Sequence, residues 1–519
     1  MQKRFFIIVM LIIFTTISAE NVHAQNDILA GWHKQYSDSL QGANIQQALD
    51  FLGQHNRKPK KKTVTVAVID SGADTLSTNI NTSFWTNPKE KPSDGVDNDK
   101  NGYTDDIHGW NFLGTRDGSF NMLSAGTEEF RQFKRLYPKY KNVKSDADVA
   151  DKAEYAYYKQ MRKKAGINNY LTFYTYNLQK AKAIEMMDSL LLTANIASAD
   201  TMNLWHVVGT EMTDTLWNGL TQMLTADLLR AGKTSTWGDF KKQQADNLDL
   251  MARRINGIEH DADKRLLMGD DLENADDRFY GNPILTIDGC EHGTFVAGVI
   301  GGNGCGDKRY AGVADGIARL MILRASPEGD EYDKDVATAI RYAVDNGAKV
   351  INISLGKYES PTPEMVNNAI AYAEKKDVLI INASGNNGRD IDTIAYYPSG
   401  INTNGERFTN LIRVGASDMK GHLCKFSNYG KNNVDLLAPG EDIASAFPTD
   451  KLDLQQGTSV AAPVVSGIAA LLRAYFPKLK ASEIKEILIS TARPDNSGEK
   501  HSVAGCVDML AAVKKIMKK

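Results

Sequence analysis

Residues 63–72 read TVTVAVIDSG, and this stretch decides the fold class. It is β-branched and almost wholly apolar as far as Ile69, which is the pattern of a strand buried on both faces of a parallel sheet. The same pattern recurs downstream in residues 349–355, 378–382, 411–415 and 434–438. Ahead of the first of these, residues 335–347 place apolar side chains on one helical face and end at a glycine. Alternating strands and helices predict a layered α/β domain with helices over a central parallel sheet.

The bulk composition is that of an ordinary globular protein. The chain has 519 residues, of which 42% are hydrophobic and 24% are charged, so it can bury a sizeable core. Its formal net charge of -3 supplies no strong positive field, and nucleic acids and anionic membranes bind to clustered Lys and Arg. We therefore expect a polypeptide or a small molecule as the partner, and no nucleic acid.

The N-terminus has the pattern of a secretory signal. Lys3 and Arg4 precede an apolar run over residues 5–17, and small residues follow as far as Ala24. The alternative is a membrane anchor, but the run is shorter than the roughly 20 apolar residues that span a bilayer. We therefore predict a signal peptide at residues 1–24, a secreted or periplasmic protein, and no stable membrane span after signal cleavage.

The rest of the chain is predicted to form one α/β domain with an insertion. Residues 25–62 are a short N-terminal lead-in that ends in the basic run RKPKKK, and the α/β domain comprises residues 63–112 and 281–519. Between these two parts lies a long proline-free stretch with apolar side chains at helical spacing, so residues 113–280 are predicted to be a mainly α-helical insertion. The tyrosine-rich residues 155–176 within it form either a binding face or part of a core.

Three polar residues lie in local settings that suit nucleophilic catalysis. Asp70 ends the strand VAVID, at the carboxyl edge of the sheet where α/β sites are built. His292 opens the segment HGTFVAGVI, and Ser459 lies in GTSVAAP at the start of an apolar helix, where N–H groups favour negative charge. Each residue alone is also typical of a capped turn, a structural histidine or a helix-capping serine. Together they supply the carboxylate, base and nucleophile that acyl transfer by serine requires.

The order Asp70, His292, Ser459 and the motifs around these residues resemble the subtilisin-like serine peptidases. The resemblance implies the three-layer α/β fold of that family, with a central, mainly parallel sheet. It also implies that the three residues are the catalytic triad and that Asn386, in ASGNNG, stabilises the oxyanion. The expected substrate contacts come from the segments SLG and ASGNNG and are Ser354, Leu355, Gly356, Ser384 and Gly385.

The function predicted from these residues is that of a secreted serine endopeptidase, which hydrolyses polypeptides through an acyl-enzyme intermediate and needs no catalytic cofactor. Two alternatives stay open: a specialised processing peptidase whose insertion gates the cleft, and a binding protein built on a protease fold. The long separation of Asp70 from His292 departs from the family pattern, and the lead-in is short for a folded inhibitory propeptide. Neither departure removes a catalytic group.

An acidic loop at residues 94–106 reads DGVDNDKNGYTDD and alternates carboxylates with amides around a glycine turn. Such oxygen ligands suit calcium, although the loop lacks the closing glutamate of an EF-hand. We predict a structural calcium ion held by Asp97, Asp99, Asn101 and Asp105. The alternative is a turn without a bound ion.

The four cysteines are Cys290, Cys305, Cys424 and Cys506. Their spacing is not that of a zinc site, and in an exported protein they allow three disulfide pairings. Cys290 lies two residues before His292, so it is either a second nucleophile or a small buried apolar side chain. We expect the buried side chain.

Overall fold

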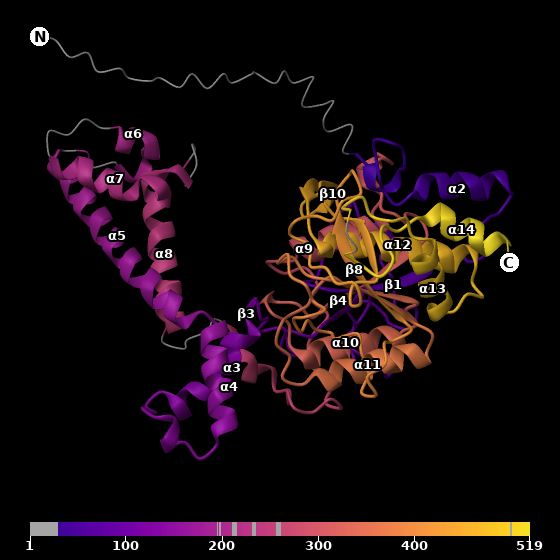
Figure 1. Cartoon of the computed structure of the whole chain (residues 1–519), viewed down its shortest axis with the longest axis horizontal. Coiled ribbons are helices and arrows are strands. Elements are labelled where there is room, and N and C mark those ends of the chain that lie inside the picture. The colour runs from indigo at the N-terminus through magenta and orange to yellow at the C-terminus, as the bar shows by residue number, and fades with distance from the viewer. Residues whose placement is uncertain are drawn as a thin grey trace, which may run out of the picture. The chain divides into compact units, whose positions relative to one another are not determined.

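The computed structural model describes residues 30–194, 196, 199–209, 215–230, 235–255, 261–498 and 501–518. The predicted signal peptide at residues 1–24 lies outside these described residues. The chain divides into two compact units (Figure 1). The first unit contains the chain up to Asn121, Met268–Pro327 and the chain from Glu331 onward, and the second contains Met122–Leu267 and Glu328–Asp330.

The first unit is built on a seven-stranded sheet in which every pair of neighbouring strands is parallel. In spatial order the strands are β2 (Gly109–Asn111), β4 (Ala318–Arg324), β1 (Val64–Asp70), β6 (Val350–Ile353), β7 (Leu379–Ala383), β8 (Leu411–Ser417) and β9 (Leu436–Pro439). All five strands predicted from sequence are present, and β1 lies inside the sheet between β4 and β6. The side chains of β7, β8 and β9 are buried throughout, which explains why these strands carry unbroken apolar runs.

Helices cover both faces of this sheet, which completes three layers. Figure 1 shows α10 (Asp333–Asp345) and α11 (Pro363–Lys375) on one side, and α9 (Glu291–Gly301) and α12 (Thr458–Tyr475) on the other. The fold is therefore the predicted three-layer α/β fold. Among the described residues, α12 is the one helix that is long and apolar enough to cross a membrane, but 94% of it is buried inside the protein, so it is a core helix.

The remaining elements of the first unit lie around these layers. A two-stranded antiparallel ribbon, β10 (Ile443–Phe447) and β11 (Lys451–Gln455), packs against α9. Three further helices are α2 (Ile45–Gln54), α13 (Ala481–Thr491) and α14 (Met509–Lys518). Helix α14 contacts both α2 and α13, so the chain segments at residues 45–54 and 509–518 lie side by side.

The described part of the predicted lead-in belongs to the hydrophobic core of the first unit. Trp32 is fully buried, and its indole Nε1 donates a hydrogen bond to the Asp442 carbonyl (3.0 Å). Ile45, Ala48 and Leu52 on α2 lie in the same core cluster as the side chains of β1. Residues 30–54 therefore pack as an integral part of the α/β unit rather than as a separate segment.

Truncation of Trp32 should destabilise the α/β unit strongly. Trp32→Ala removes a fully buried indole and leaves a cavity, so we expect the free energy of unfolding to fall by about 3–5 kcal/mol. Urea denaturation followed by circular dichroism would measure this change. Leu76→Ala is the control, because Leu76 is 81% exposed, and it should change stability by less than about 0.5 kcal/mol. Equal effects of the two substitutions would contradict the packing of the lead-in.

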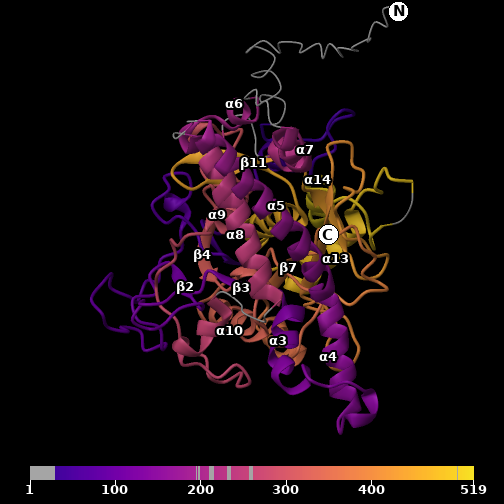
Figure 2. The same ribbon diagram turned by 90° about the vertical axis from the view of Figure 1, so that its left-hand side faces the viewer.

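The second unit is mainly helical, as predicted for the insertion. Its helices are α3 (Glu128–Tyr140), α4 (Lys152–Lys164), α5 (Ile167–Thr193), α6 (Leu204–Val208), α7 (Thr215–Arg230) and α8 (Trp237–Ile255). A short parallel pair, β3 (Ser124–Gly126) with β5 (Glu328–Gly329), also lies in this unit. Helices α5 and α8 run side by side in both views (Figures 1 and 2).

The tyrosine-rich part of the insertion contributes to a core and also reaches the surface. Tyr158 is buried and stacks on Phe133, with ring centroids 5.7 Å apart, and Tyr155 packs against the same cluster. Tyr176 is 48% exposed and lies beneath the Lys180 ammonium. Tyr155 and Tyr158 therefore belong to a core, as one of the two interpretations expects.

Candidate active site

The carboxyl end of β1 brings Asp70 to the start of α9. Asp70 is buried, and its Oδ1 accepts hydrogen bonds from the Ser71 backbone N–H (2.8 Å) and from His292 Nδ1 (2.7 Å). The helix approaches the strand closely because its third residue is Gly293. A β-carbon there would lie 1.9 Å from the Gly72 carbonyl oxygen, so only glycine fits. The small residues of the HGT motif therefore allow His292 to reach Asp70.

The Asp70 carboxylate also sets the protonation of His292. A carboxylate can only accept, so Nδ1 carries the proton in this bond and the neutral ring keeps Nε2 as an acceptor. Burial lowers the pKa of His292, but the negative charge and hydrogen bond of Asp70 outweigh burial and raise the pKa above its ordinary value of 6.5. His292 thus has the tautomer and basicity of a general base.

Ser459 lies at the amino end of α12, the second residue of that helix. Gly457, the N-cap residue just before α12, has φ of 150°, a conformation that side-chain-bearing residues rarely adopt. A β-carbon on Gly457 would lie 3.0 Å from Ser459 Oγ and 3.4 Å from Asn386 Nδ2, so these two atoms border the same small space. The N–H groups and the positive dipole end of α12 lie at this end of the helix, an arrangement that favours negative charge beside Ser459.

Thr458 fixes the orientation of the Asn386 amide. Both its backbone N–H (2.8 Å) and its hydroxyl (2.9 Å) donate to Asn386 Oδ1. Its hydroxyl oxygen also accepts the Gly385 N–H (3.0 Å). With Oδ1 occupied in this way, Asn386 turns Nδ2 toward Ser459, which is the geometry of an oxyanion donor. Thr458 was not among the predicted site residues, although the motif GTS contains it.

The predicted substrate-binding residues lie on two adjacent strand ends next to Ser459. The Ser354 hydroxyl, just past β6, donates to the Ser459 carbonyl (2.8 Å). Leu355 and Gly356 are partly exposed, and Asn382 at the end of β7 donates its amide to the Leu355 carbonyl (2.9 Å). On the other side, the Ser384 hydroxyl donates to the Asn428 carbonyl (3.1 Å), which holds the segment that leads to Gly385.

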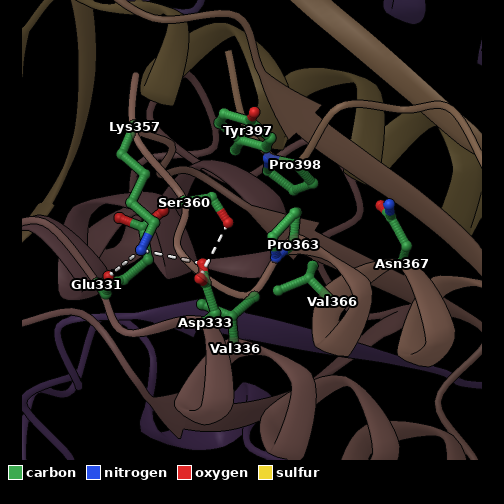
Figure 3. Close-up of a pocket in the computed structure, with 10 residues that line it drawn as sticks. All are labelled: Glu331, Asp333, Val336, Lys357, Ser360, Pro363, Val366, Asn367, Tyr397 and Pro398. Carbon is green, nitrogen blue, oxygen red and sulfur yellow. Dashed lines mark hydrogen bonds and ion pairs between the residues drawn. The ribbon is translucent and has the colours of Figure 1, made fainter. Parts of the chain in front are cut away.

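A small cavity lies next to Lys357, the residue that follows Gly356 (Figure 3). The Lys357 ammonium is fully buried and bonds to the Asp333 carboxylate (3.0 Å) and the Glu331 carbonyl (2.8 Å). Ser360 donates a further hydrogen bond to Asp333 (2.9 Å), and Tyr397 and Pro398 line the same cavity. Lys357 directly follows Gly356 in the chain, and its positive charge is therefore paired with Asp333 inside the fold.

Two carboxylates of the acidic loop lie beside Glu90, which precedes the loop, and the three together can hold a cation. One oxygen each from Glu90, Asp97 and Asp99 lie within 4.8 Å of one another. Glu90 is buried, and its Oε1 accepts the N–H groups of Asn98 (2.7 Å) and Asp99 (3.0 Å). Its Oε2 is also buried and has no hydrogen-bond partner among the described residues. An orphaned carboxylate oxygen beside two further carboxylates fits a hard divalent cation.

The other two predicted calcium ligands take part in the folding of the loop. Asp105 accepts the backbone N–H groups of Asp94 and Gly95, both at 3.1 Å. Asn101 Oδ1 accepts the Tyr103 N–H (2.8 Å). The structure thus groups Asp97 and Asp99 with Glu90 and not with Asp105. Glu90 was missed from sequence because it lies outside the DGVDNDKNGYTDD motif.

The cysteine side chains that the structure describes are Cys290, Cys424 and Cys506, and all three are buried and free. Cys290 precedes α9, and burial raises the pKa of its thiol. A thiol with a raised pKa is a weaker nucleophile at neutral pH. This agrees with the expectation of a small buried apolar side chain. The side chain of Cys305 lies outside the described residues.

Comparison with known proteins points to one family. A model of the subtilase family matches residues 212–506, which include His292, Asn386 and Ser459 and begin after Asp70. Three similar proteins illustrate the match. A thermophilic serine proteinase of Bacillus sp. (strain AK1) is 33% identical over 46% of this chain and 54% of that protein. Subtilisin BL of Lederbergia lenta is 33% identical over 40% of this chain and 72% of that protein, and the cell wall-associated protease of Bacillus subtilis (strain 168) is 34% identical over 49% of this chain and 28% of that protein.

The coverage of these relatives is partial. This chain spans about half the length of the thermophilic proteinase (54%) and 28% of the cell wall-associated protease. Among solved structures, the prenylagaramide maturation protease is 31% identical, with 44% of this chain and 83% of that chain covered and a TM-score of 0.39.

Proposed function

The chain belongs to the subtilase family, and from this premise we propose that it is a serine endopeptidase that cleaves polypeptides through Asp70, His292 and Ser459. The observation that carries the proposal is the hydrogen bond between His292 Nδ1 and Asp70 (2.7 Å). A second observation supports it: Ser459 Oγ and Asn386 Nδ2 border the same small space beside Gly457. The α/β unit thus contains a candidate for each group that the reaction needs: nucleophile, base, orienting carboxylate and oxyanion donor.

The proposed reaction follows from the role of each group. Ser459 Oγ attacks the carbonyl carbon of the scissile peptide bond while His292 Nε2 takes its proton. Asp70 holds the ring and stabilises the imidazolium that forms, and Asn386 Nδ2 with the Ser459 N–H donates to the oxyanion. The imidazolium then returns the proton to the leaving amine. Water, activated by His292 in the same way, hydrolyses the acyl-enzyme.

A fluorophosphonate probe tests this function directly, because it reacts with an activated serine. The proposal expects covalent labelling of the full chain at Ser459, cleavage of an unfolded polypeptide, and loss of both in Ser459→Ala. A wild-type chain that is folded but labels no better than Ser459→Ala would overturn it.

The pH dependence of activity should reflect the raised pKa of His292. Neutral His292 is the base, so protonation removes activity, and a pKa raised by Asp70 moves this loss to a higher pH. We expect the acid limb of the kcat/KM profile to lie above pH 6.5, the ordinary value of histidine. In Asp70→Asn the charge is lost while burial remains, so the limb of the residual activity should move down. A wild-type limb below pH 6.5 would contradict this assignment.

We also propose that the chain is exported. The apolar run at residues 5–17 supports export, as does the similarity to a relative that is named cell wall-associated. Because Trp32 lies in the core, the mature chain should retain it. N-terminal sequencing of protein from the medium or periplasm should therefore find a first residue after Ala24 and before Trp32. Recovery of protein that still carries residues 1–24 would contradict cleavage.

The acidic loop is proposed to bind a structural calcium ion through Glu90, Asp97 and Asp99. Calcium takes six to eight oxygen ligands, so carboxylates gathered around an orphaned oxygen suit it, and the ion would neutralise their mutual repulsion. Binding to the folded state alone stabilises by about 2.7 kcal/mol when free calcium is 100 times the Kd.

Removal of calcium should therefore lower the Tm of the wild-type protein, and calcium should restore it better than magnesium, which demands a stricter geometry. Differential scanning calorimetry with a chelator would measure this. Glu90→Gln should abolish the response to calcium, whereas Asp105→Asn should leave it. A loss of the calcium response in Asp105→Asn but not in Glu90→Gln would support the ligand set predicted from sequence. A wild-type Tm that does not respond to calcium would contradict the proposed calcium site.

A further inference from the structure

The two segments proposed to hold the substrate are bridged by one aromatic ring, that of Tyr396. A β-carbon on Gly356 would lie 2.5 Å from the Tyr396 hydroxyl oxygen and 2.6 Å from its Cζ. A β-carbon on Gly385 would lie 2.9 Å from Tyr396 Cε2 and 3.0 Å from Cζ. The ring therefore touches both glycines, and Tyr396 is only 6% exposed. The space between the two strand ends is filled by this side chain.

The Tyr396 ring is held firmly in that position. The Tyr358 ring packs edge-on against it, with centroids 5.3 Å apart. Tyr358 is itself anchored, since its hydroxyl donates to Asn387 Oδ1 and accepts from Asn428 Nδ2, both at 2.9 Å. On another side, the buried Arg413 guanidinium lies 5.5 Å from the Tyr396 ring centre. A ring packed between an anchored tyrosine and a buried cation does not move aside at low cost.

The space that Tyr396 fills is where one substrate side chain has to go. The attacked carbonyl must lie beside Ser459 Oγ and Asn386 Nδ2. The side chain of the residue that supplies this carbonyl begins at Cβ, two bonds away from the carbonyl carbon. Gly385 directly precedes Asn386, and Gly356 lies on the segment whose Ser354 hydroxyl bonds to the Ser459 carbonyl, so both glycines flank this position. That side chain therefore enters the gap between the two glycines, over the Tyr396 ring.

The gap also offers little to a charged side chain. Lys357 is the cation closest in sequence to Gly356, but its ammonium is buried against Asp333 and the Glu331 carbonyl (Figure 3). The antiparallel backbone hydrogen bonds between Lys357 and Tyr397 (2.8 and 3.2 Å) join this segment to the one that carries Tyr396. The floor of the gap is therefore aromatic and closed.

We propose that Tyr396 limits the residue on the acyl side of the scissile bond to a small, uncharged side chain such as Gly, Ala or Ser. This inference rests on the proposed peptidase function and names the substrate class of the same site. An added ring or long chain at that position would have to displace Tyr396 from its packed position, which is unfavourable in a dense interior.

The test compares kcat/KM for two chromogenic peptides that differ only in the residue before the scissile bond, Ala or Phe. The wild type should prefer Ala by roughly tenfold to a hundredfold. Tyr396→Gly should raise the relative kcat/KM for Phe at least tenfold, because it opens the gap. Tyr396→Phe should keep the wild-type ratio, since the ring remains. Tyr397→Ala is the matched control, because Tyr397 lines the cavity beside Lys357, and it should also keep the ratio.

Titration with a fluorophosphonate separates this inference from the function on which it rests. Wild-type protein that is not labelled means that the proposed function fails. Wild-type protein that is labelled but cleaves the Phe peptide as well as the Ala peptide overturns the role of Tyr396 while the function stands. If Tyr396→Gly does not fold, the wild-type ratio still decides, and Tyr396→Leu, which shortens the side chain without removing it, should shift the ratio in the same direction.

Discussion

Replacement of His292 by alanine should lower kcat on the order of 10⁴-fold to 10⁶-fold, and addition of Ser459→Ala to this variant should lower it little further. We expect this because, in the proposed mechanism, Ser459 is a weak nucleophile until His292 takes its proton, so the two residues would act as one unit. The remaining activity would come from oxyanion binding by Asn386 and from the substrate contacts. Single-turnover kinetics on one chromogenic peptide would measure His292→Ala, Ser459→Ala and the double variant.

A second histidine provides a matched control for this experiment. His422 Nδ1 also pairs with a carboxylate, that of Asp418 (3.1 Å), and its side chain is 43% exposed against 41% for His292. His422→Ala should leave kcat within about threefold of the wild type, because His422 matches His292 in exposure and in its carboxylate partner but is not part of the proposed triad. Strictly additive losses in His292→Ala and Ser459→Ala would show that these two residues do not act as one unit. A large loss in His422→Ala would show that the effect of His292→Ala is not specific to the proposed triad.

The parallel sheet could be predicted from sequence because its strands are buried on both faces. Strand β1 and strands β6 to β9 carry runs of Val, Ile, Leu and Ala whose burial the structure confirms. Strand β4 was missed, because its apolar centre lies between Arg319 and Arg324. Arg324 is buried, but it donates to the Asn111 side chain (3.0 Å) and the Ser71 carbonyl (3.2 Å). A buried arginine whose partners come from distant segments is not visible in a local pattern.

The residues proposed as the triad could be chosen from sequence because each lies in a local motif, whereas residues whose contacts come from distant segments could not. Thr458 positions Asn386 from 72 positions away in the chain. Glu90 contributes to the acidic cluster only after the loop has folded back on it. Tyr396 reaches Gly356 and Gly385 only when three segments meet. Such roles depend on tertiary contacts, and a single sequence contains no periodic signal for them.

The packing of the lead-in likewise depends on contacts between distant segments. The sequence of the lead-in is short and ends in a basic run, and neither feature indicates whether the segment packs on the α/β domain. The structure buries Trp32 and one face of α2 in the core of the α/β unit. The apolar residues of this segment are few, and the surface that covers them comes from the other end of the chain, at α14. Burial of this kind arises between distant segments and has no local signature.

Replacement of Asn386 by alanine should lower kcat by roughly 10²-fold to 10³-fold and leave KM nearly unchanged. Asn386 Nδ2 faces the space beside Ser459 Oγ, where negative charge is present in the transition state and absent from the bound substrate. Loss of this donor therefore removes stabilisation from the transition state alone. Steady-state kinetics on the Ala peptide would measure kcat and KM separately.

Two neighbouring substitutions sharpen the assignment of Asn386. Asn387→Ala removes an adjacent exposed amide that accepts from Tyr358, and it should change kcat by less than about fivefold. Thr458→Val removes the hydroxyl that donates to Asn386 Oδ1 but keeps the backbone N–H that does the same. Its effect on kcat should therefore lie between those of the other two, with KM unchanged. A rise in KM at constant kcat in Asn386→Ala would instead assign this residue to substrate binding, because an interaction made equally in the ground state and the transition state changes KM alone.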